Sequence, residues 1–146
     1  MDSEDARAAV QALVDDHGFL SWLDVAVESV GKGAVVLRVP FDETLVNDTV
    51  EVRGGVHGGV ASTLADTAGG IALRTVLDDP LSSVATIDLN VSYLQPARAD
   101  LVATADVVRA GTTVGVARVD VEAVDDGERT LVAAAQGSYR LFRGEE

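Results

Sequence analysis

A glycine-led segment between Arg53 and Leu77 constrains the fold of this chain most strongly; it reads RGGVHGGVASTLADTAGGIALRTVL. Four of the six residues at positions 54–59 are glycines, and His57 lies among them. A glycine-rich helix start leaves backbone N–H groups free at the positive end of the helix dipole. Because glycine has no Cβ, a ligand oxygen can also approach the main chain closely. The segment predicts a helix over about 58–77, ended by Asp78-Asp79-Pro80, whose start can bind an oxygen atom.

Asp66 is the one acidic residue within this apolar helix, where an Asp is locally unfavourable and needs a reason. If the helix begins near Gly59, Asp66 lies two turns on, about 10 Å along the axis. Its face of the helix carries Ser62, Gly69 and Gly70, small residues that leave room for a substrate or a second chain. Alternatively, Asp66 bonds to Ser62 or to a partner backbone and has only a packing role.

The charge balance is strongly acidic, with a formal net charge of −13, 10 Arg and the single lysine Lys32. Such a surface repels nucleic acid and anionic membranes, so neither is an expected partner. The negative charges of the protein also repel one another, which destabilises the compact state in dilute buffer. At about 1 M salt the screening length falls to about 3 Å and this self-repulsion is largely removed. The Asp-rich, Lys-poor composition therefore predicts a halophilic protein adapted to a salty cytoplasm, the alternative being an ordinary acidic protein.

Several classes of site are disfavoured by the residues that the chain lacks. There is no cysteine, which excludes disulfides and thiolate sites, and two histidines are too few for most His-based metal sites. We therefore expect neither a metal nor a separate cofactor. No apolar run approaches the roughly 18 residues of a membrane span, and the acidic start is unlike a signal peptide. The expected location is the cytoplasm.

The order of elements predicts a single α+β domain over residues 1–146. An N-terminal helix comes first, then a hairpin, a long polar connection, the glycine-led helix, and four long strands expected to form an antiparallel meander. A curved sheet of about six strands can wrap the long helix, and a dimer formed through edge strands would cover the exposed sheet edges. The expected ranges are 4–16 for the first helix, 22–30 and 34–39 for the hairpin, 41–56 for the connection, and 84–94, 100–110, 112–124 and 129–142 for the last strands.

Three blocks of sequence carry a resemblance that covers nearly the whole chain in element order. The first two, at this separation, are fairly specific, whereas the third is weak. The chain resembles the hotdog-fold acyl-CoA thioesterases, in particular the phenylacetate-pathway (PaaI-like) branch. The resemblance implies a hotdog fold, with the sheet wrapped around one central helix. The blocks are Gly55-Val56-His57-Gly58-Gly59 with Leu64-Ala65-Asp66 and Gly69-Gly70-Ile71-Ala72; TIDLNVSYL at 86–94 with Pro96-Ala97; and Ala134-Ala135-Gln136-Gly137.

The family's chemistry implies a role for particular residues of this chain. By resemblance, the N–H of Gly58 binds the thioester carbonyl oxygen, and Asp66 of the other subunit is the general base or the attacking carboxylate. Thr86 lies where relatives often carry a hydroxyl that orients the water or carboxylate, although it is equally a good strand residue. His57 and Gly59 are assigned to substrate binding, with His57 shaping the helix start rather than moving protons.

Two positions depart from the family pattern. Relatives usually have an Asn about six residues before the motif His, where this chain has Glu51, and the nearest Asn is Asn47. Either the loop folds Asn47 back into that role, or Asn47 is an ordinary loop residue and the function is altered. The second departure is Gln95, where relatives often have Arg.

The function implied is hydrolysis of an aromatic or medium-chain acyl-CoA by a homo-oligomer, a homodimer at least and a homotetramer by expectation. Coenzyme A is part of the substrate in this interpretation. The alternative is a non-catalytic acyl-CoA-binding or sensor protein; a dehydratase lacks support because His17 has no suitable acidic partner in sequence. Cations that could meet the anionic coenzyme, or equally be solvated surface residues, are Arg53, Arg74, Arg98 and Arg109.

Overall fold

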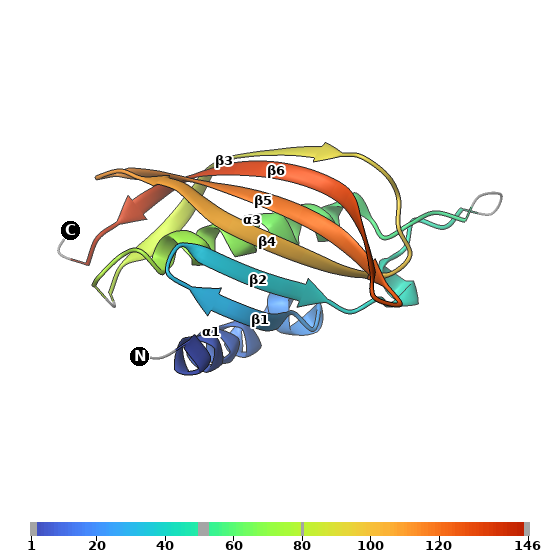
Figure 1. Ribbon diagram of the computed structural model, residues 1–146, viewed down its shortest axis with the longest axis horizontal. Helices are drawn as coiled ribbons and strands as arrows, with labels where there is room; N and C mark the ends of the chain where they lie inside the picture. Colours follow the sequence, from blue (N-terminus) through green and yellow to red (C-terminus); the bar gives the residue numbers. More distant parts are fainter. Residues whose placement is uncertain (1–2, 50–52, 80, 145–146) are drawn as a thin grey trace.

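A six-stranded antiparallel sheet curves around one long helix, α3 (Gly58–Arg74), in a computed structural model that describes residues 3–49, 53–79 and 81–144 (Figure 1). The predicted α+β arrangement is therefore confirmed, although α3 ends three residues earlier than expected. The strands are β1 (Ala26–Gly31), β2 (Ala34–Val39), β3 (Ser83–Tyr93), β4 (Asp100–Ala110), β5 (Val114–Asp125) and β6 (Glu128–Phe142).

The strand order is β1-β2-β4-β5-β6-β3, which corrects the predicted four-strand meander. Strands β4, β5 and β6 do follow one another, but β3 pairs with β6 at the far edge of the sheet. The connection after β3 passes across the end of the molecule to reach β4 (Figure 1). Periodicity identifies a strand but not its neighbour, so the sequence pattern could not distinguish the two orders.

The N-terminal region contains one helix more than predicted. Helix α1 (Ser3–Asp16) is confirmed, but a second short helix, α2 (Gly18–Trp22), follows it, and the strand expected from Trp22 begins at Ala26 instead. The side chain of His17 caps α2 by accepting a hydrogen bond from the Leu20 N–H, 3.3 Å away. None of the helices in the described ranges is long and apolar enough to cross a membrane.

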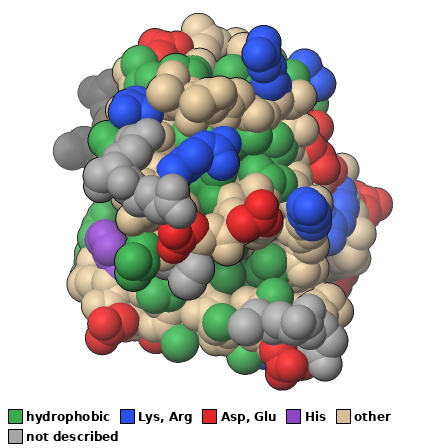
Figure 2. Space-filling model, turned by 90° about the vertical axis from the view of Figure 1, so that its left-hand side faces the viewer, with side chains coloured by type: hydrophobic (Ala, Val, Ile, Leu, Met, Phe, Trp, Pro, Cys, Tyr) green, Lys and Arg blue, Asp and Glu red, His purple; other side chains and the backbone are tan. Residues whose placement is uncertain are grey.

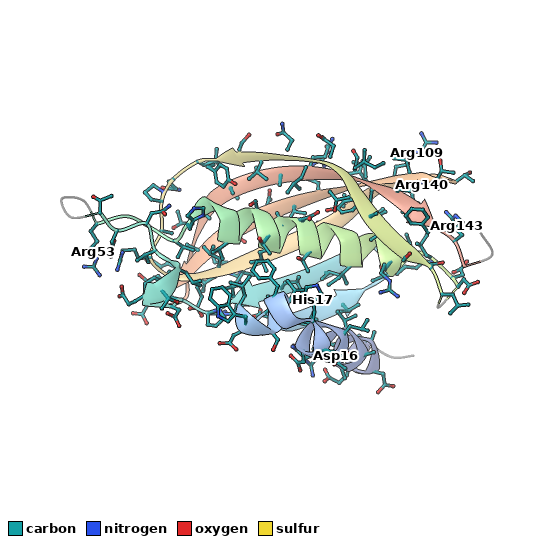
Figure 3. The ribbon with its side chains drawn as sticks, turned by 180° about the vertical axis from the view of Figure 1, so that it is seen from behind. Asp16, His17, Arg53, Arg109, Arg140 and Arg143 are labelled. Carbon is teal, nitrogen blue, oxygen red and sulfur yellow. The ribbon has the colours of Figure 1, made fainter. Side chains whose placement is uncertain are left out.

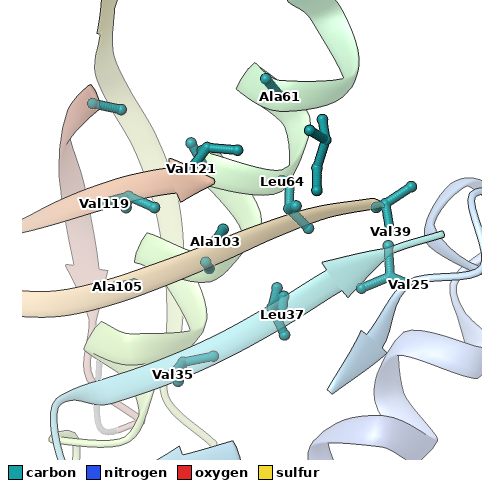
Figure 4. Packing of buried hydrophobic residues seen from close by; sticks show 14 of the residues in the cluster. Val25, Val35, Leu37, Val39, Ala61, Leu64, Ala103, Ala105, Val119 and Val121 are labelled. Atoms are coloured by element: carbon teal, nitrogen blue, oxygen red, sulfur yellow. The ribbon is translucent and has the colours of Figure 1, made fainter. Parts of the chain in front are cut away.

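The core lies between α3 and the concave face of the sheet. Inward side chains of the central strands, such as Leu37, Val119 and Val121, are fully buried around Leu64 of α3 (Figure 4). Alanines on the same helix, including Ala65 and Ala68, are also fully buried. Their small side chains allow close approach of helix and sheet, so this packing fixes where the start and middle of α3 lie.

Gly69 and Gly70 are buried against Tyr139 of β6, which corrects the expectation that they leave room for a substrate or a second chain. A Cβ on Gly69 would overlap the Tyr139 hydroxyl, whereas a Cβ on Gly70 would make ordinary contacts at 3.4 Å with Val84 and 3.5 Å with the Tyr139 ring. The space beside these glycines is therefore filled by the chain's own tyrosine.

Gly69→Ala should destabilise the protein by about 1–3 kcal/mol, because the added methyl group overpacks a fully buried site. Gly70→Ala is the matched control one residue along the same helix. It should be neutral or stabilising by up to about 1 kcal/mol, since alanine is the better helix former. Denaturant unfolding of the two variants checks this, and equal free energies of unfolding would contradict the close contact with Tyr139.

One edge strand of the sheet, β1, is covered by a helix, whereas the other, β3, is not covered by the residues that the structure describes. At the β1 edge, α1 supplies side-chain partners to the backbone: Gln11 bonds the Val27 N–H at 2.7 Å and the Val25 carbonyl at 3.1 Å, and Arg7 bonds the Val27 carbonyl. Among the strands in the described ranges, β3 pairs with β6 alone, and Ile87 and Tyr93 on it are each 58% exposed. An uncovered edge of this length offers a surface for pairing with a second chain.

Candidate active site

His57 fixes the start of α3. As the N-cap, it has non-helical backbone angles (φ −55°, ψ 133°), and its Nδ1 accepts a hydrogen bond from the Gly59 N–H at 2.8 Å. Its own N–H donates to the Leu45 carbonyl at 2.7 Å, which ties the helix start to the preceding loop. One of the first amides of the helix is therefore satisfied by the cap.

The amide of Gly58 is left free by this arrangement. In the part of the chain that the structure describes, no group accepts a hydrogen bond from the Gly58 N–H. The ring of Tyr93, from the end of β3, lies beside it, because a Cβ on Gly58 would be 3.0 Å from Tyr93 Cε1. A free N–H at the positive end of a 17-residue helix is suited to bind a carbonyl oxygen or an oxyanion.

Asp66 is held in place from two sides. Its Oδ1 accepts a hydrogen bond from the Thr86 hydroxyl of β3 at 2.7 Å, so the structure brings these two predicted residues together. Its backbone carbonyl accepts one from the Tyr139 hydroxyl at 2.9 Å. Ser62, the alternative partner considered from the sequence, donates instead to the Gly59 carbonyl at 3.2 Å. The carboxylate thus faces the β3 edge.

Tyr139 is the site residue that sequence reasoning missed. Burial raises the pKa of its hydroxyl well above the ordinary tyrosine value, and the nearby Asp66 carboxylate adds to the rise. The hydroxyl therefore stays protonated at neutral pH and remains a donor to the Asp66 carbonyl. The available signal was the pair Gly69-Gly70, since two adjacent glycines inside a helix indicate close contact with a large neighbour.

Gly58 and Asp66 of one chain cannot act on the same atom. They are eight residues apart on α3, which separates them by about 12 Å along the axis. Both nevertheless lie toward β3, since Gly58 contacts Tyr93 and Asp66 contacts Thr86 on that strand.

The expected long connection 41–56 has structure of its own. It contains a short 3-10 helix, η1 (Glu43–Leu45), and an isolated bridge between Val46 and Val56. Arg98 holds it with ion pairs to Glu43 at 2.9 Å and Asp48 at 3.0 Å. Among the cations considered for coenzyme A, Arg98 is therefore already engaged.

Asn47 is exposed on this connection and is not seen folded back onto Gly58. Its N–H donates to the Gly55 carbonyl at 2.8 Å. Its own carbonyl oxygen packs so closely against Gly54 that a Cβ on that glycine would overlap it. Glu51, which occupies the position of the family Asn, lies outside the described residues.

Cavities lined by described residues lie on both halves of α3. The larger, about 760 Å³, lies beside the C-terminal half of the helix and is lined by α1 together with Thr67, Ile71 and Arg74. The smaller, about 360 Å³, adjoins the helix start and includes His57 and Gly59. In the described ranges, no group of three or more acidic, His or Cys side chains could hold a metal ion.

Comparison with known proteins agrees with this architecture. The sequence profile of the thioesterase superfamily matches residues 53–130, more than half of the chain. The chain belongs to the thioesterase superfamily. A candidate esterase of Halobacterium salinarum is 53% identical over 146 residues, covering 97% of this chain and 96% of that protein. A medium/long-chain acyl-CoA thioesterase of Escherichia coli is 35% identical over 99 residues, covering 59% of this chain and 62% of that protein.

Solved structures of other superfamily members share the fold. A thioesterase of Haemophilus influenzae has a TM-score of 0.83 at 22% identity, covering 96% of this chain and 92% of its own. A thioesterase family protein of Silicibacter pomeroyi has a TM-score of 0.82 at 26% identity, covering 92% and 96%. The hotdog fold implied by the resemblance is confirmed, while the phenylacetate-pathway branch is not distinguished by these comparisons.

Proposed function

We propose that this protein hydrolyses acyl-CoA thioesters to a free acid and coenzyme A. The observation that carries the proposal is the free Gly58 N–H at the positive end of α3, on the side of the molecule where Asp66 is also presented. Membership of the thioesterase superfamily supports the reaction class. The Escherichia coli relative, an acyl-CoA thioesterase by name, supports the choice of thioester.

We further propose that each active site is shared between two copies of the chain. The separation of Gly58 and Asp66 by about 12 Å requires that the carboxylate come from another subunit. The uncovered β3 edge is the surface through which a second copy would pair, since the β1 edge is already covered by α1. A two-fold axis beside β3 would bring the Gly58 of each subunit toward the Asp66 of its partner.

The chemistry then follows from the contacts described. Water attacks the carbonyl carbon while Asp66 accepts a proton from the water, and the Gly58 N–H binds the oxyanion that forms. When the carbon–sulfur bond breaks, sulfur leaves as a thiolate, which takes up the proton. In the alternative route, Asp66 itself attacks and water then hydrolyses the mixed anhydride. In both routes Thr86 orients the carboxylate and Tyr139 anchors the backbone that carries it.

The acidity of the protein bears on how it binds an anionic coenzyme. Arg53 lies at one end of the molecule, and Arg109, Arg140 and Arg143 lie at the other (Figure 3). The latter end carries basic side chains interspersed with acidic ones (Figure 2). In the described ranges, Arg53, Arg74 and Arg109 form no ion pair, and we propose them as candidate contacts for the phosphates of coenzyme A. Arg53 and Arg109, at opposite ends of one subunit, would meet the same coenzyme only if it binds between two subunits.

Turnover of acyl-CoA should rise from dilute buffer to molar salt. Screening shortens from about 10 Å at 0.1 M to about 3 Å at 1 M, so repulsion between the coenzyme and a protein of charge −13 weakens. The measurement is a thiol-release screen across short, medium, long and aromatic acyl-CoA substrates in both buffers. An uncharged N-acetylcysteamine thioester is the control, and its KM should respond less to salt than that of the matching acyl-CoA.

Two outcomes would contradict this interpretation. Maximal activity in dilute buffer would show that electrostatic repulsion does not limit the enzyme. Saturable binding of acyl-CoA without thiol release across the whole panel would favour the non-catalytic binding protein, consistent with the exposed position of Asn47.

A further inference from the structure

The smaller cavity is walled by an aromatic pair at the start of α3. Trp22 and Phe19 of α2 are 66% and 50% exposed, and their rings stack with centroids 6.5 Å apart at an interplanar angle of 16°. The chain has only six aromatic residues, and Trp22 is its single tryptophan. Large apolar side chains grouped on the surface beside a hollow are typical of a binding site. The cavity is lined by Phe19, Trp22, Leu23, Thr44, Leu45, Val46, His57, Gly59, Val60 and Thr63.

The position of this cavity relates it to the proposed reaction. His57 and Gly59, the residues on either side of Gly58, both contribute to its wall. An acyl group whose carbonyl oxygen is held by the Gly58 N–H can therefore extend into it. The larger cavity is less suited, because Thr67, its lining residue on α3 nearest the helix start, is about 14 Å from Gly58 along the axis.

The lining sets limits on what the cavity can accept. None of its ten residues is acidic, and none is Lys or Arg. A terminal carboxylate would therefore be desolvated there without a partner cation. Its volume of about 360 Å³ is near the lower end of ligand cavities, which span about 300–1,000 Å³. By its lining and its volume, the smaller cavity therefore suits a compact apolar acyl group.

We propose that this cavity is the acyl pocket, and that Trp22 and Phe19 select uncharged acyl groups of medium length or with a single ring. The inference rests on the proposed function and deepens it by naming the pocket and the side chains that select the acyl group. Acyl groups that end in a carboxylate would be rejected, and an acetyl group would be too short to reach the aromatic pair.

Selectivity between acyl groups tests the proposal by kinetics. Trp22→Ala should lower kcat/KM for octanoyl-CoA by roughly ten-fold or more, while acetyl-CoA changes less than about two-fold. Trp22→Phe, which keeps a ring, should retain most of the preference. Phe142→Ala is the control, because it removes another exposed aromatic ring, at the end of β6, and should leave the octanoyl-to-acetyl ratio unchanged.

Binding can be followed without turnover, because all tryptophan emission comes from Trp22. The non-hydrolysable thioether S-octyl-CoA should change this emission saturably, whereas coenzyme A alone should not. Unchanged emission with S-octyl-CoA, in an enzyme that hydrolyses octanoyl-CoA, would overturn the pocket and leave the proposed function intact. Saturable emission changes without hydrolysis of any acyl-CoA would support the pocket and overturn the function.

The aromatic pair could instead contact another subunit, and the same variants separate the two roles. If Trp22→Ala lowers the oligomeric mass measured by light scattering while the octanoyl-to-acetyl ratio stays unchanged, the pair is a subunit contact and the acyl pocket is overturned. An unchanged mass with a collapsed ratio is the result expected for a pocket wall.

Discussion

Replacing Asp66 with alanine is expected to lower kcat for thiol release by roughly 10²–10⁴-fold, the usual contribution of a general base. The carboxylate is the acidic group that α3 presents toward the β3 edge, and Thr86 holds it at 2.7 Å. Asp66→Asn should be nearly as inactive, because an amide can still bond the Thr86 hydroxyl but cannot accept a proton from water. Thiol release under saturating acyl-CoA in molar salt gives the measurement.

A matched control separates loss of the base from loss of one negative charge. Asp106→Asn removes the same charge from an exposed position on β4, so its kcat should stay near that of the parent. Circular dichroism and oligomeric mass of the Asp66 variants should also be unchanged. If Asp66→Ala and Asp66→Asn both hydrolyse like the parent, the carboxylate is structural and the mechanism is wrong.

The two roles left open for Asp66 differ in the origin of one oxygen atom. In a single turnover in ¹⁸O-labelled water, a general base delivers labelled oxygen directly to the acid product. A nucleophilic carboxylate donates its own unlabelled oxygen when water attacks the Asp66 side of the anhydride, and Asp66 then carries the label. Mass spectrometry of the peptide that contains Asp66 distinguishes the routes.

The sequence predicted the elements that carry chemistry better than it predicted how they are arranged. The glycine-led start of α3 and the strand over 100–110 were predicted at the positions where the structure has them. Both predictions depend on local signals, namely glycines that precede a helix and the alternation of apolar and polar residues along a strand. Helix α2 was missed, since five residues are too few to establish a helical period and its cap depends on His17. The place of β3 beside β6 was missed because strand order is a property of the whole sheet.

In the candidate site, too, local features could be predicted from the sequence, whereas contacts between distant segments could not. Asp66 and Gly58 could be singled out from the sequence because each breaks a local expectation for a helix. Thr86 was named only through the family resemblance, and its hydrogen bond to Asp66, 20 residues away, is known from the structure. Tyr139, 73 residues from Asp66 along the chain, was not named at all. Asn47 was considered for a catalytic role because relatives carry an Asn before the motif His and Asn47 is the nearest one in this chain. The structure places it exposed on a loop, where its N–H bonds the Gly55 carbonyl.

Gly58→Pro should lower kcat by about 10²–10³-fold relative to Gly58→Ala, the cost of removing one oxyanion donor. Proline lacks the N–H but is well tolerated at the first position of a helix. The preceding residue, His57, has a ψ of 133°, within the range of about +120 to +160° that a following proline favours. Alanine is the matched control because it keeps the N–H while adding the same Cβ against the ring of Tyr93, a residue that is 58% exposed. Equal kcat values for the two variants would exclude this amide as the oxyanion donor.

Combining these variants tests whether the site is shared between subunits. A dimer with one Asp66→Ala chain and one Gly58→Pro chain contains one site with both groups intact and one with neither, if each site takes one group from each subunit. Random reassociation of equal amounts makes half of the dimers mixed, so about a quarter of the parental activity should return. If both groups came from the same chain, every site would lack one of them and the mixture would stay inactive. Recovery of activity on mixing would therefore place the catalytic carboxylate across the subunit interface, as the separation of Gly58 and Asp66 on α3 demands.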